Sequence, residues 1–172
     1  RFTLTSVTVH VGGTGPLRVT PATADIQTVL NNAAAGRLVI FAPGVYDKQL
    51  LILPKPLRLQ GAGPGSTFIN AAKVPNTKLQ DWRTRLDSLL GAGAVDLLPT
   101  QEAGAGGIEP LTLNTEQGAG ITVMGRADSR CTGATPASNC FVAGRAARID
   151  GFTISGGDSA GAIYVNGWAH GL

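Results

Sequence analysis

A succession of short apolar runs, each ended by glycine, proline or asparagine, constrains the fold of this chain more than any other feature. Few of these runs are separated by helical spacing, whereas a doubly wound α/β fold needs a helix between parallel strands. We therefore expect an all-β architecture of short strands. The runs lie at 38–41, 50–53, 57–59, 68–69, 111–113, 121–124, 141–143, 149–154 and 163–165.

The composition narrows the choice of protein class. The 172 residues include 24 glycines and 10 prolines, and charged residues make up only 15% of the chain. A coiled coil needs far more charge, and a disordered tail needs less apolar surface than the 43% of hydrophobic residues provide. The glycines follow no three-residue period, which excludes collagen. A globular, turn-rich chain remains.

Two segments depart from the strand pattern. Residues 24–35 carry apolar side chains at helical spacing, and Gly36 follows as a C-cap, so an amphipathic helix is predicted there. A second helical face lies between residues 76 and 91, within a stretch at 73–109 that reads as an insertion of one helix and a long loop. We expect Trp82, on the apolar face of this helix, to pack in the interior rather than stack on a ligand.

Three stretches carry a resemblance to a known family. They are IQTVLNNAAAGRLVIFAPGVY at 26–46, KPLRLQGAGPGSTFIN at 55–70 and RIDGFTISGGDSAGAIYVNG at 148–167. Together they resemble the N-terminal part of right-handed parallel β-helix proteins, the pectate-lyase and pectinesterase-like superfamily, of the bacterial surface type. The resemblance implies a right-handed single-stranded parallel β-helix with an N-terminal capping α-helix and an inserted helix and loop. These motifs are specific for the fold and much less so for an activity.

The resemblance also implies an organisation. Residues 1–22 form an N-terminal strand, expected at 4–11, and a lead-in. Residues 23–172 begin the β-helix, with the helix at 24–35 as its cap, and the coils continue beyond the chain end. The segment 43–46 is expected to turn between the first and second strands. Asparagine residues are expected at corners of the coils, where a positive φ is tolerated: Asn70 and Asn166.

Charge and hydropathy bear on partners and on the compartment. The formal net charge is +3, and the basic residues are scattered rather than gathered in a stripe, so nucleic acid is not expected as a partner. No apolar run approaches the roughly 18 residues of a membrane span. The chain begins at Arg1, in the middle of a pattern, which suggests either a processed chain or a fragment.

The two cysteines are separated by turn-forming residues. Cys131 and Cys140 bracket the sequence TGATPASN, and a disulfide that staples this loop is predicted, with two free thiols as the alternative. A disulfide implies export from the cytoplasm, to the periplasm, the medium or the cell surface of a bacterium. No further ligand lies near them in sequence, so neither a metal nor another cofactor is expected.

The motifs that suggest chemistry lack their context. The segment GDSAG around Ser159 matches the nucleophile elbow of α/β-hydrolases, but a strand rather than a helix is expected to follow. Pectinesterases carry a glutamine in the corresponding segment, and residues 159–162 have none. Asp150 and Asp158 are too few for the six to eight oxygens of a calcium site, and we interpret them as solvated turn acids. His10 is expected to be exposed.

One cluster near the C-terminus could bind a ligand. Tyr164, Trp168 and His170 are interpreted as a possible sugar-stacking patch, with ordinary packing as the alternative. Two functions therefore stand at this stage. The first is a non-catalytic extracellular structural or adhesion module, whose partners are the remainder of the same β-helix, neighbouring chains at an open C-terminal end, or a polysaccharide. The second is the N-terminal part of a polysaccharide lyase or esterase-like enzyme with its catalytic residues outside this chain.

Overall fold

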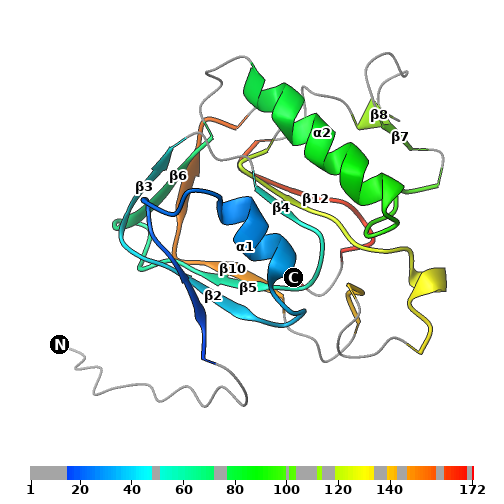
Figure 1. Cartoon of the computed structure of the whole chain (residues 1–172), viewed down its shortest axis with the longest axis horizontal. Helices are drawn as coiled ribbons and strands as arrows, with labels where there is room; N and C mark the ends of the chain where they lie inside the picture. The colour runs from blue at the N-terminus through cyan, green and yellow to red at the C-terminus, as the bar shows by residue number, and fades with distance from the viewer. Residues whose placement is uncertain are drawn as a thin grey trace.

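The computed structural model describes residues 15–47, 51–71, 77–99, 101–103, 112–113, 119–133, 139–142, 147–157, 161–169 and 172. Within these ranges the protein is mostly β, with parallel sheets and two α-helices. The N-terminal strand expected at 4–11 lies outside the described residues. Figure 1 shows the strands arranged around an interior, with α2 on the outside.

Most strands belong to three parallel sheets, which the chain visits in the same order on each circuit. Sheet A contains β1 (Leu17–Val19), β2 (Leu38–Phe41), β5 (Arg58–Gln60) and β10 (Arg148–Asp150), in that spatial order. Sheet B contains β3 (Gly44–Asp47), β6 (Thr67–Asn70) and β11 (Thr153–Ser155). Sheet C contains β4 (Leu51–Leu53), β9 (Ile121–Val123) and β12 (Ile163–Val165).

The strands group into three successive coils, each with one strand from each of the sheets A, B and C. The first coil is β2, β3 and β4, the second is β5, β6 and β9, and the third is β10, β11 and β12. This succession is compatible with the parallel β-helix expected from the sequence. Two smaller elements lie outside the coils: the pair β7 (Glu102–Ala103) and β8 (Thr112–Leu113), and the 3₁₀ helix η2 (Asp128–Arg130).

The strand boundaries correct the sequence-based expectation in two places. The segment 43–46 is not a turn, because β3 already begins at Gly44, whose φ is 141° and whose added Cβ would lie 2.5 Å from Pro21. The apolar run 149–154 is not one strand but two. Gly151, at φ 77°, turns the chain between β10 and β11 where it packs against the backbone of Gly61. Both corrections place glycine where a side chain does not fit.

Phe141 and Val142, also expected to begin a strand, lie in irregular backbone. Phe141 is nevertheless buried in the main core, where its ring serves the packing that a strand residue would serve. An apolar run identifies a buried segment, but it does not by itself identify the backbone conformation of that segment.

Helix α1 (Ile26–Asn32) is shorter than the 24–35 expected from the sequence. Asp25 is its N-cap, and the carboxylate accepts a hydrogen bond from the backbone N–H of Thr28 at 3.1 Å. The helix ends at Ala33, whose backbone is extended. Gly36 does not cap it, because the N–H of Gly36 donates instead to the carbonyl of Pro56, just before β5. The chain thus leaves the helix before Gly36 and contacts the next coil there.

Helix α1 covers the N-terminal end of the coils, and Figure 1 looks onto this end. The helix buries Ile26, Gln27 and Leu30 against the main core. Strand β4 is the edge strand of sheet C, so among the described residues no strand pairs with the outer side of Ile52. The side chain of Gln27 supplies the missing partners: its amide N–H donates to the Ile52 carbonyl at 2.7 Å, and its Oε1 accepts from the Ile52 N–H at 2.8 Å.

The main core fills the space that the three sheets enclose. Residues in equivalent positions of successive coils stack into columns, such as Leu51 on Ile121 and Leu53 on Val123, and these four side chains have no exposed surface. The aromatic members pack edge to face, with 5.2 Å between the ring centroids of Phe41 and Tyr46. Small and aliphatic side chains dominate the columns, which suits strands stacked about 4.8 Å apart.

Helix α2 (Thr77–Gly91) lies within the stretch expected as an insertion, between β6 and β9. It belongs to a second apolar cluster on the outer side of sheet C, where Trp82 and Leu86 pack with Ile52 and Met124. Trp82 is 1% exposed, so its expected packing role is confirmed. Strands β4 and β9 of sheet C are therefore buried on both faces and contain only buried residues.

Candidate functional site

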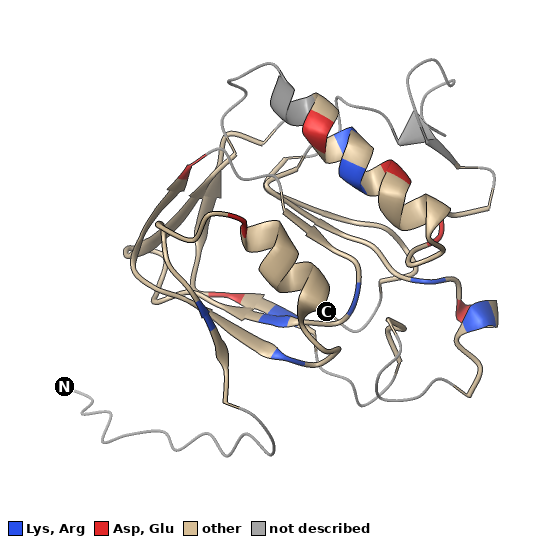
Figure 2. Cartoon of the chain, in the orientation of Figure 1, with Lys and Arg blue, Asp and Glu red and all other residues tan. Residues whose placement is uncertain are grey.

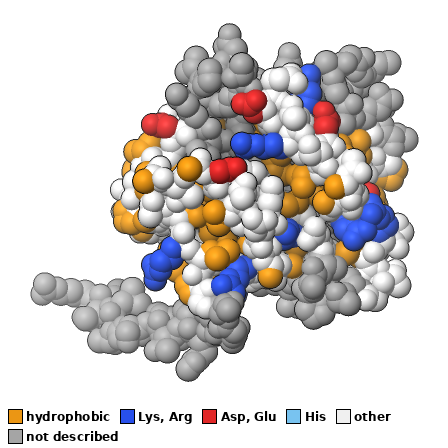
Figure 3. All heavy atoms as spheres, viewed as in Figure 1, with side chains coloured by type: hydrophobic (Ala, Val, Ile, Leu, Met, Phe, Trp, Pro, Cys, Tyr) orange, Lys and Arg blue, Asp and Glu red, His pale blue; other side chains and the backbone are white. Residues whose placement is uncertain are grey.

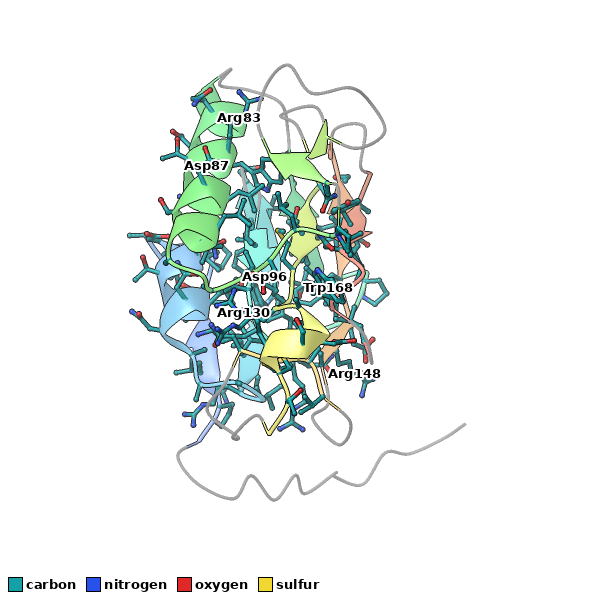
Figure 4. The ribbon with its side chains drawn as sticks, turned by 90° about the vertical axis from the view of Figure 1, so that its right-hand side faces the viewer. Arg83, Asp87, Asp96, Arg130, Arg148 and Trp168 are labelled. Carbon is teal, nitrogen blue, oxygen red and sulfur yellow. A yellow bond between two sulfur atoms is a disulfide. The ribbon has the colours of Figure 1, made fainter. Side chains whose placement is uncertain are left out.

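The residues expected to stack on a sugar lie at the end of the third coil. Tyr164 is in the middle of β12, on the outward face of sheet C, in register with Thr122 and half-buried in the second apolar cluster. Trp168 follows in the turn after β12, and its indole N–H donates to the carbonyl of Leu97 at 2.9 Å. Figure 4 labels Trp168 on the face of the molecule that is turned toward the viewer. His170 lies outside the described residues.

Gln101 ties this region together, and the sequence analysis did not identify it. Its amide nitrogen lies 3.4 Å from the hydroxyl of Tyr164, while its Oε1 accepts from the backbone N–H of Leu98 at 3.0 Å and from the side-chain amide of Asn166 at 2.9 Å. Asn166 is 1% exposed, and its Oδ1 finds no hydrogen-bond partner in the part of the chain that the structure describes. The structure thus brings Tyr164, Asn166 and Trp168 together beneath the segment that follows α2. Tyr164 and Trp168 are both partly exposed.

The outward face of sheet B is a second candidate surface. The side chains of Val45, Phe68 and Thr153 form one row across the three strands, and those of Asp47 and Asn70 stand in the adjacent row. Val45 is 52% exposed and Phe68 36%, and the Asn70 amide donates to the Asp47 carboxylate at 2.9 Å. In Figure 3 apolar side chains gather at the left, where Figure 1 places β3 and β6.

The predicted disulfide between Cys131 and Cys140 is present. It staples the loop that follows η2, and the neighbouring Arg130 anchors the same region. The Arg130 guanidinium forms an ion pair with Asp96 and donates to the carbonyl of Gly93 at 3.0 Å. The other carboxylate oxygen of Asp96 accepts from the backbone N–H of Ala127 at 2.8 Å. Figure 4 shows Asp96 and Arg130 pointing toward one another. The disulfide and these contacts therefore have a structural role in this region.

A small cavity of about 190 Å³ lies between the two helices. Its lining is mixed: Gln27, Asn31, Thr84, Arg85, Ser88 and Leu89. The hydroxyls of Thr84 and Ser88 donate to carbonyls of their own helix, and Gln27 is committed to Ile52. Since Oδ1 of Asn31 accepts from the Gln27 amide at 2.8 Å, Arg85 and the amide nitrogen of Asn31 are the lining groups that remain for a ligand, which is few for a specific site.

Hydrogen bonds and burial shift three pKa values. The pKa of Asp25 is lowered, chiefly by the hydrogen bond from the Thr28 hydroxyl and then by that from the Thr28 backbone. Burial lowers the pKa of Lys55, whose ammonium donates to the carbonyls of Asn31 and Ala33. Burial also raises the pKa of Tyr46, whose hydroxyl lies against the carbonyls of Val19 and Ala42. All three groups serve the N-terminal end of the coils.

The other residues that suggested chemistry give no assembled site in the part of the chain that the structure describes. Asp150 forms an ion pair with Arg148 on the outward face of β10. Ser159, Asp158 and His10 lie outside the described residues. Within the described ranges no three histidine, cysteine, aspartate or glutamate residues are grouped to hold a metal ion. Figure 2 shows the charged residues dispersed over helices and strands.

No helix within the described ranges is both long and apolar enough to cross a membrane. No family model, curated protein or solved structure matches this chain.

Proposed function

We propose that this chain is a non-catalytic, extracellular structural or adhesion module built on a right-handed single-stranded parallel β-helix. The observation that supports it most is the threefold succession of strands through sheets A, B and C, each in parallel register with the coil before. Connections between parallel strands of one sheet are right-handed in nearly all proteins, which supports right-handed coils in this chain. Such stacks present long, regular outer faces and are suited to scaffolding and surface contact.

The disulfide supports an extracytoplasmic location. Cys131 and Cys140 are paired, and disulfides persist mainly in secreted, periplasmic and surface proteins because cytoplasmic thiols are kept reduced. A turn-rich loop that carries few apolar residues gains from such a staple. We therefore place the module in the bacterial periplasm, at the cell surface or in the medium.

A polysaccharide is the ligand class that suits the module best. Tyr164 and Trp168 each use their polar atom in a hydrogen bond within the protein, and both residues are partly exposed. Partly exposed aromatic rings held in place by such bonds favour stacking on the apolar faces of sugar rings. We include His170 in this patch as a proposal on its position in the sequence alone.

A second candidate function is the N-terminal part of a carbohydrate-active enzyme, with catalytic residues outside this chain. The outward face of sheet B favours it, because Phe68 is exposed beside the hydrogen-bonded pair Asp47 and Asn70. An aromatic ring next to a carboxylate and a carboxamide offers both stacking and hydrogen bonds to sugar hydroxyls. The two functions thus make different faces of the coils the contact surface for a polysaccharide.

One experiment compares the two functions. The purified chain is run by affinity electrophoresis through gels that contain pectin or alginate, and the same polymers are assayed for new reducing ends and unsaturated products, with and without Ca²⁺. We expect retardation without products. Trp168→Ala should abolish retardation and the matched variant Phe68→Ala should not. The converse pattern would favour the sheet B face, and turnover of either polymer would refute the non-catalytic function.

A further inference from the structure

The outward face of sheet A gathers arginines that lie far apart in the sequence. Each arginine within its strands is followed by a residue that packs in the main core, namely Val19, Leu59 or Ile149. Because successive side chains of a strand point to opposite faces, these arginines point away from the core. We call this surface the arginine face; it consists of Arg18 in β1, Arg37 directly before β2, Arg58 in β5 and Arg148 in β10. In Figure 2 the blue segments at the lower left lie along these strands.

Like charges lie directly opposite each other on the arginine face. Arg58 and Arg148 are register partners on neighbouring strands, and two like charges in this arrangement destabilise a sheet. The side chain of Arg148 is 64% exposed and forms an ion pair with Asp150. Arg58 donates through its Nε to the carbonyl of Gly36 at 3.3 Å. Among the described residues neither Arg58 nor Arg18 forms an ion pair, so positive charge on this face is left without a counter-charge there.

The surplus charge of the whole chain is found on the arginine face. The face has four arginines, and the strands of sheet A contain one acidic residue, Asp150. The difference of three equals the formal net charge of +3, so the rest of the chain carries equal numbers of basic and acidic residues. The fold thus turns bases that are scattered along the sequence into one positively charged side of the molecule, whose potential attracts anions.

The shape and composition of the arginine face favour a flat anionic surface as its partner. The strands of sheet A are three or four residues long and pair in register, so their outward side chains lie side by side. The aromatic residue of these strands is Phe41, which is completely buried in the core. The strands described here therefore offer no outward ring on which a sugar or a nucleic-acid base could stack. Half-buried Leu38 and Ile40 lie among the arginines instead.

We propose that the arginine face docks on an anionic lipid membrane, where its guanidinium groups donate hydrogen bonds to headgroup phosphates. Arginine stays charged, and its planar fork of donors fits the oxygens of a phosphate. A bilayer presents its phosphates in one plane, which a flat row of arginines meets at several points at once. Each arginine that reaches the surface strengthens binding about fivefold, and salt screens this attraction. The inference goes beyond the proposed function and uses a different sheet from the patch of Tyr164 and Trp168.

Vesicle flotation tests the proposal. The chain is mixed with vesicles of phosphatidylcholine alone, or of equal parts of phosphatidylcholine and phosphatidylglycerol, and the bound fraction is measured. We expect binding to the anionic vesicles and none to the neutral ones. Binding should be strong at about 0.01 M salt, where the Debye length is about 30 Å, and lost near 1 M, where it is about 3 Å.

Substitutions on the arginine face should change this binding in both directions. At about 0.1 M salt, where a Debye length of about 10 Å screens distant charges, the double variant Arg18→Gln, Arg148→Gln should bind about 30-fold more weakly, because two arginines are lost. Asp150→Asn removes the acid from the face and should bind about fivefold more tightly. Arg85→Gln and Asp87→Asn are the matched controls at exposed positions of α2 and should leave binding unchanged.

Three outcomes would overturn the proposal. One is a chain that does not bind anionic vesicles at low salt. Another is an equal loss of binding in Arg148→Gln and Arg85→Gln, which would reduce the effect to net charge. The third is retention on dextran sulfate that depends on Arg148, without binding to vesicles, which would make an acidic polymer the partner. Trp168→Ala should leave vesicle binding unchanged, so failure here is distinguishable from failure of the proposed function.

Discussion

The two ends of the stacked coils show how one kind of strand edge is treated in two ways. At the N-terminal end, α1 lies over the core, and Gln27 completes the hydrogen bonding of β4. At the other end, the equivalent core columns surface at Ile163 and Val165, which are 41% and 42% exposed. The first end is covered by a helix, whereas the second presents partly exposed apolar side chains.

One side chain is enough to satisfy the outward-facing backbone groups of a three-residue edge strand. The N–H of Leu51 and the carbonyl of Leu53 are used by the backbone of the second coil, so only the N–H and carbonyl of Ile52 point outward from β4. A single carboxamide carries one donor and one acceptor, which matches this need. Three-residue strands can therefore be closed by one glutamine, whereas a long edge strand would leave many groups free.

The largest difference in stability should separate two isoleucine-to-alanine substitutions in the same column of side chains. Ile121→Ala removes a completely buried side chain and should lower the free energy of unfolding by about 2–5 kcal/mol. Ile163→Ala removes the same atoms one coil later, where 41% of the residue is exposed, and should cost about 1 kcal/mol or less. Chemical denaturation of the two variants measures the difference. Equal losses would mean that the two ends do not differ as the structure shows.

The closed end should be next in sensitivity. Gln27→Leu keeps the bulk of the side chain but leaves the N–H and carbonyl of Ile52 buried without partners, at a cost of about 2–4 kcal/mol. Gln27→Glu, with its carboxylate ionised, can still accept from the N–H but cannot donate to the carbonyl, so we expect an intermediate loss. Thermal and denaturant unfolding measure both.

Asn31→Ala is the matched control for Gln27. It removes the side-chain partner of the Gln27 amide and leaves both hydrogen bonds to Ile52 in place. We expect it to cost clearly less than Gln27→Leu. If the two variants were equally destabilised, the contact with Ile52 would have no special weight in closing this end.

Acid should weaken the closed end by a smaller amount. The pKa of Asp25 is lowered in the folded protein, so its contribution is complete above the unfolded value of about 3.9 and is lost as the pH falls through the lower folded value. Asp25→Asn keeps a capping side chain without the titration. The stability of the wild type relative to this variant should therefore decline below about pH 4. A difference that stays constant between pH 7 and pH 2.5 would contradict this role for the carboxylate.

Short-range signals made several parts of the molecule predictable. Strands β2 and β12 coincide with the apolar runs expected at 38–41 and 163–165, because a run bounded by turn residues is itself the local signature of a buried strand. The disulfide was predictable because Cys131 and Cys140 are nine positions apart and the residues between them form turns, which brings the two cysteines within reach. The position of α2 followed from its helical spacing, and its boundary at Gly91 from the glycine itself.

Contacts between distant residues were not predictable in this way. Gln27 and Ile52 are 25 positions apart, and nothing in the local pattern distinguishes this glutamine from one on a solvated helix face. Gln101 likewise meets Tyr164 and Asn166 only because the segment after α2 lies over sheet C. The partners of such polar side chains depend on which elements the fold places opposite them.

The sequence by itself determined that this chain forms short, stacked strands, since glycine, proline and small aliphatic residues recur at the spacing of coil corners and narrow columns. Which end of the stack is covered and which is exposed depends on tertiary contacts. Ile121 and Ile163 are both isoleucines in the same column of side chains, yet Ile121 is buried and Ile163 is exposed. The physical reason is that burial depends on the layer stacked above, which the local sequence does not encode.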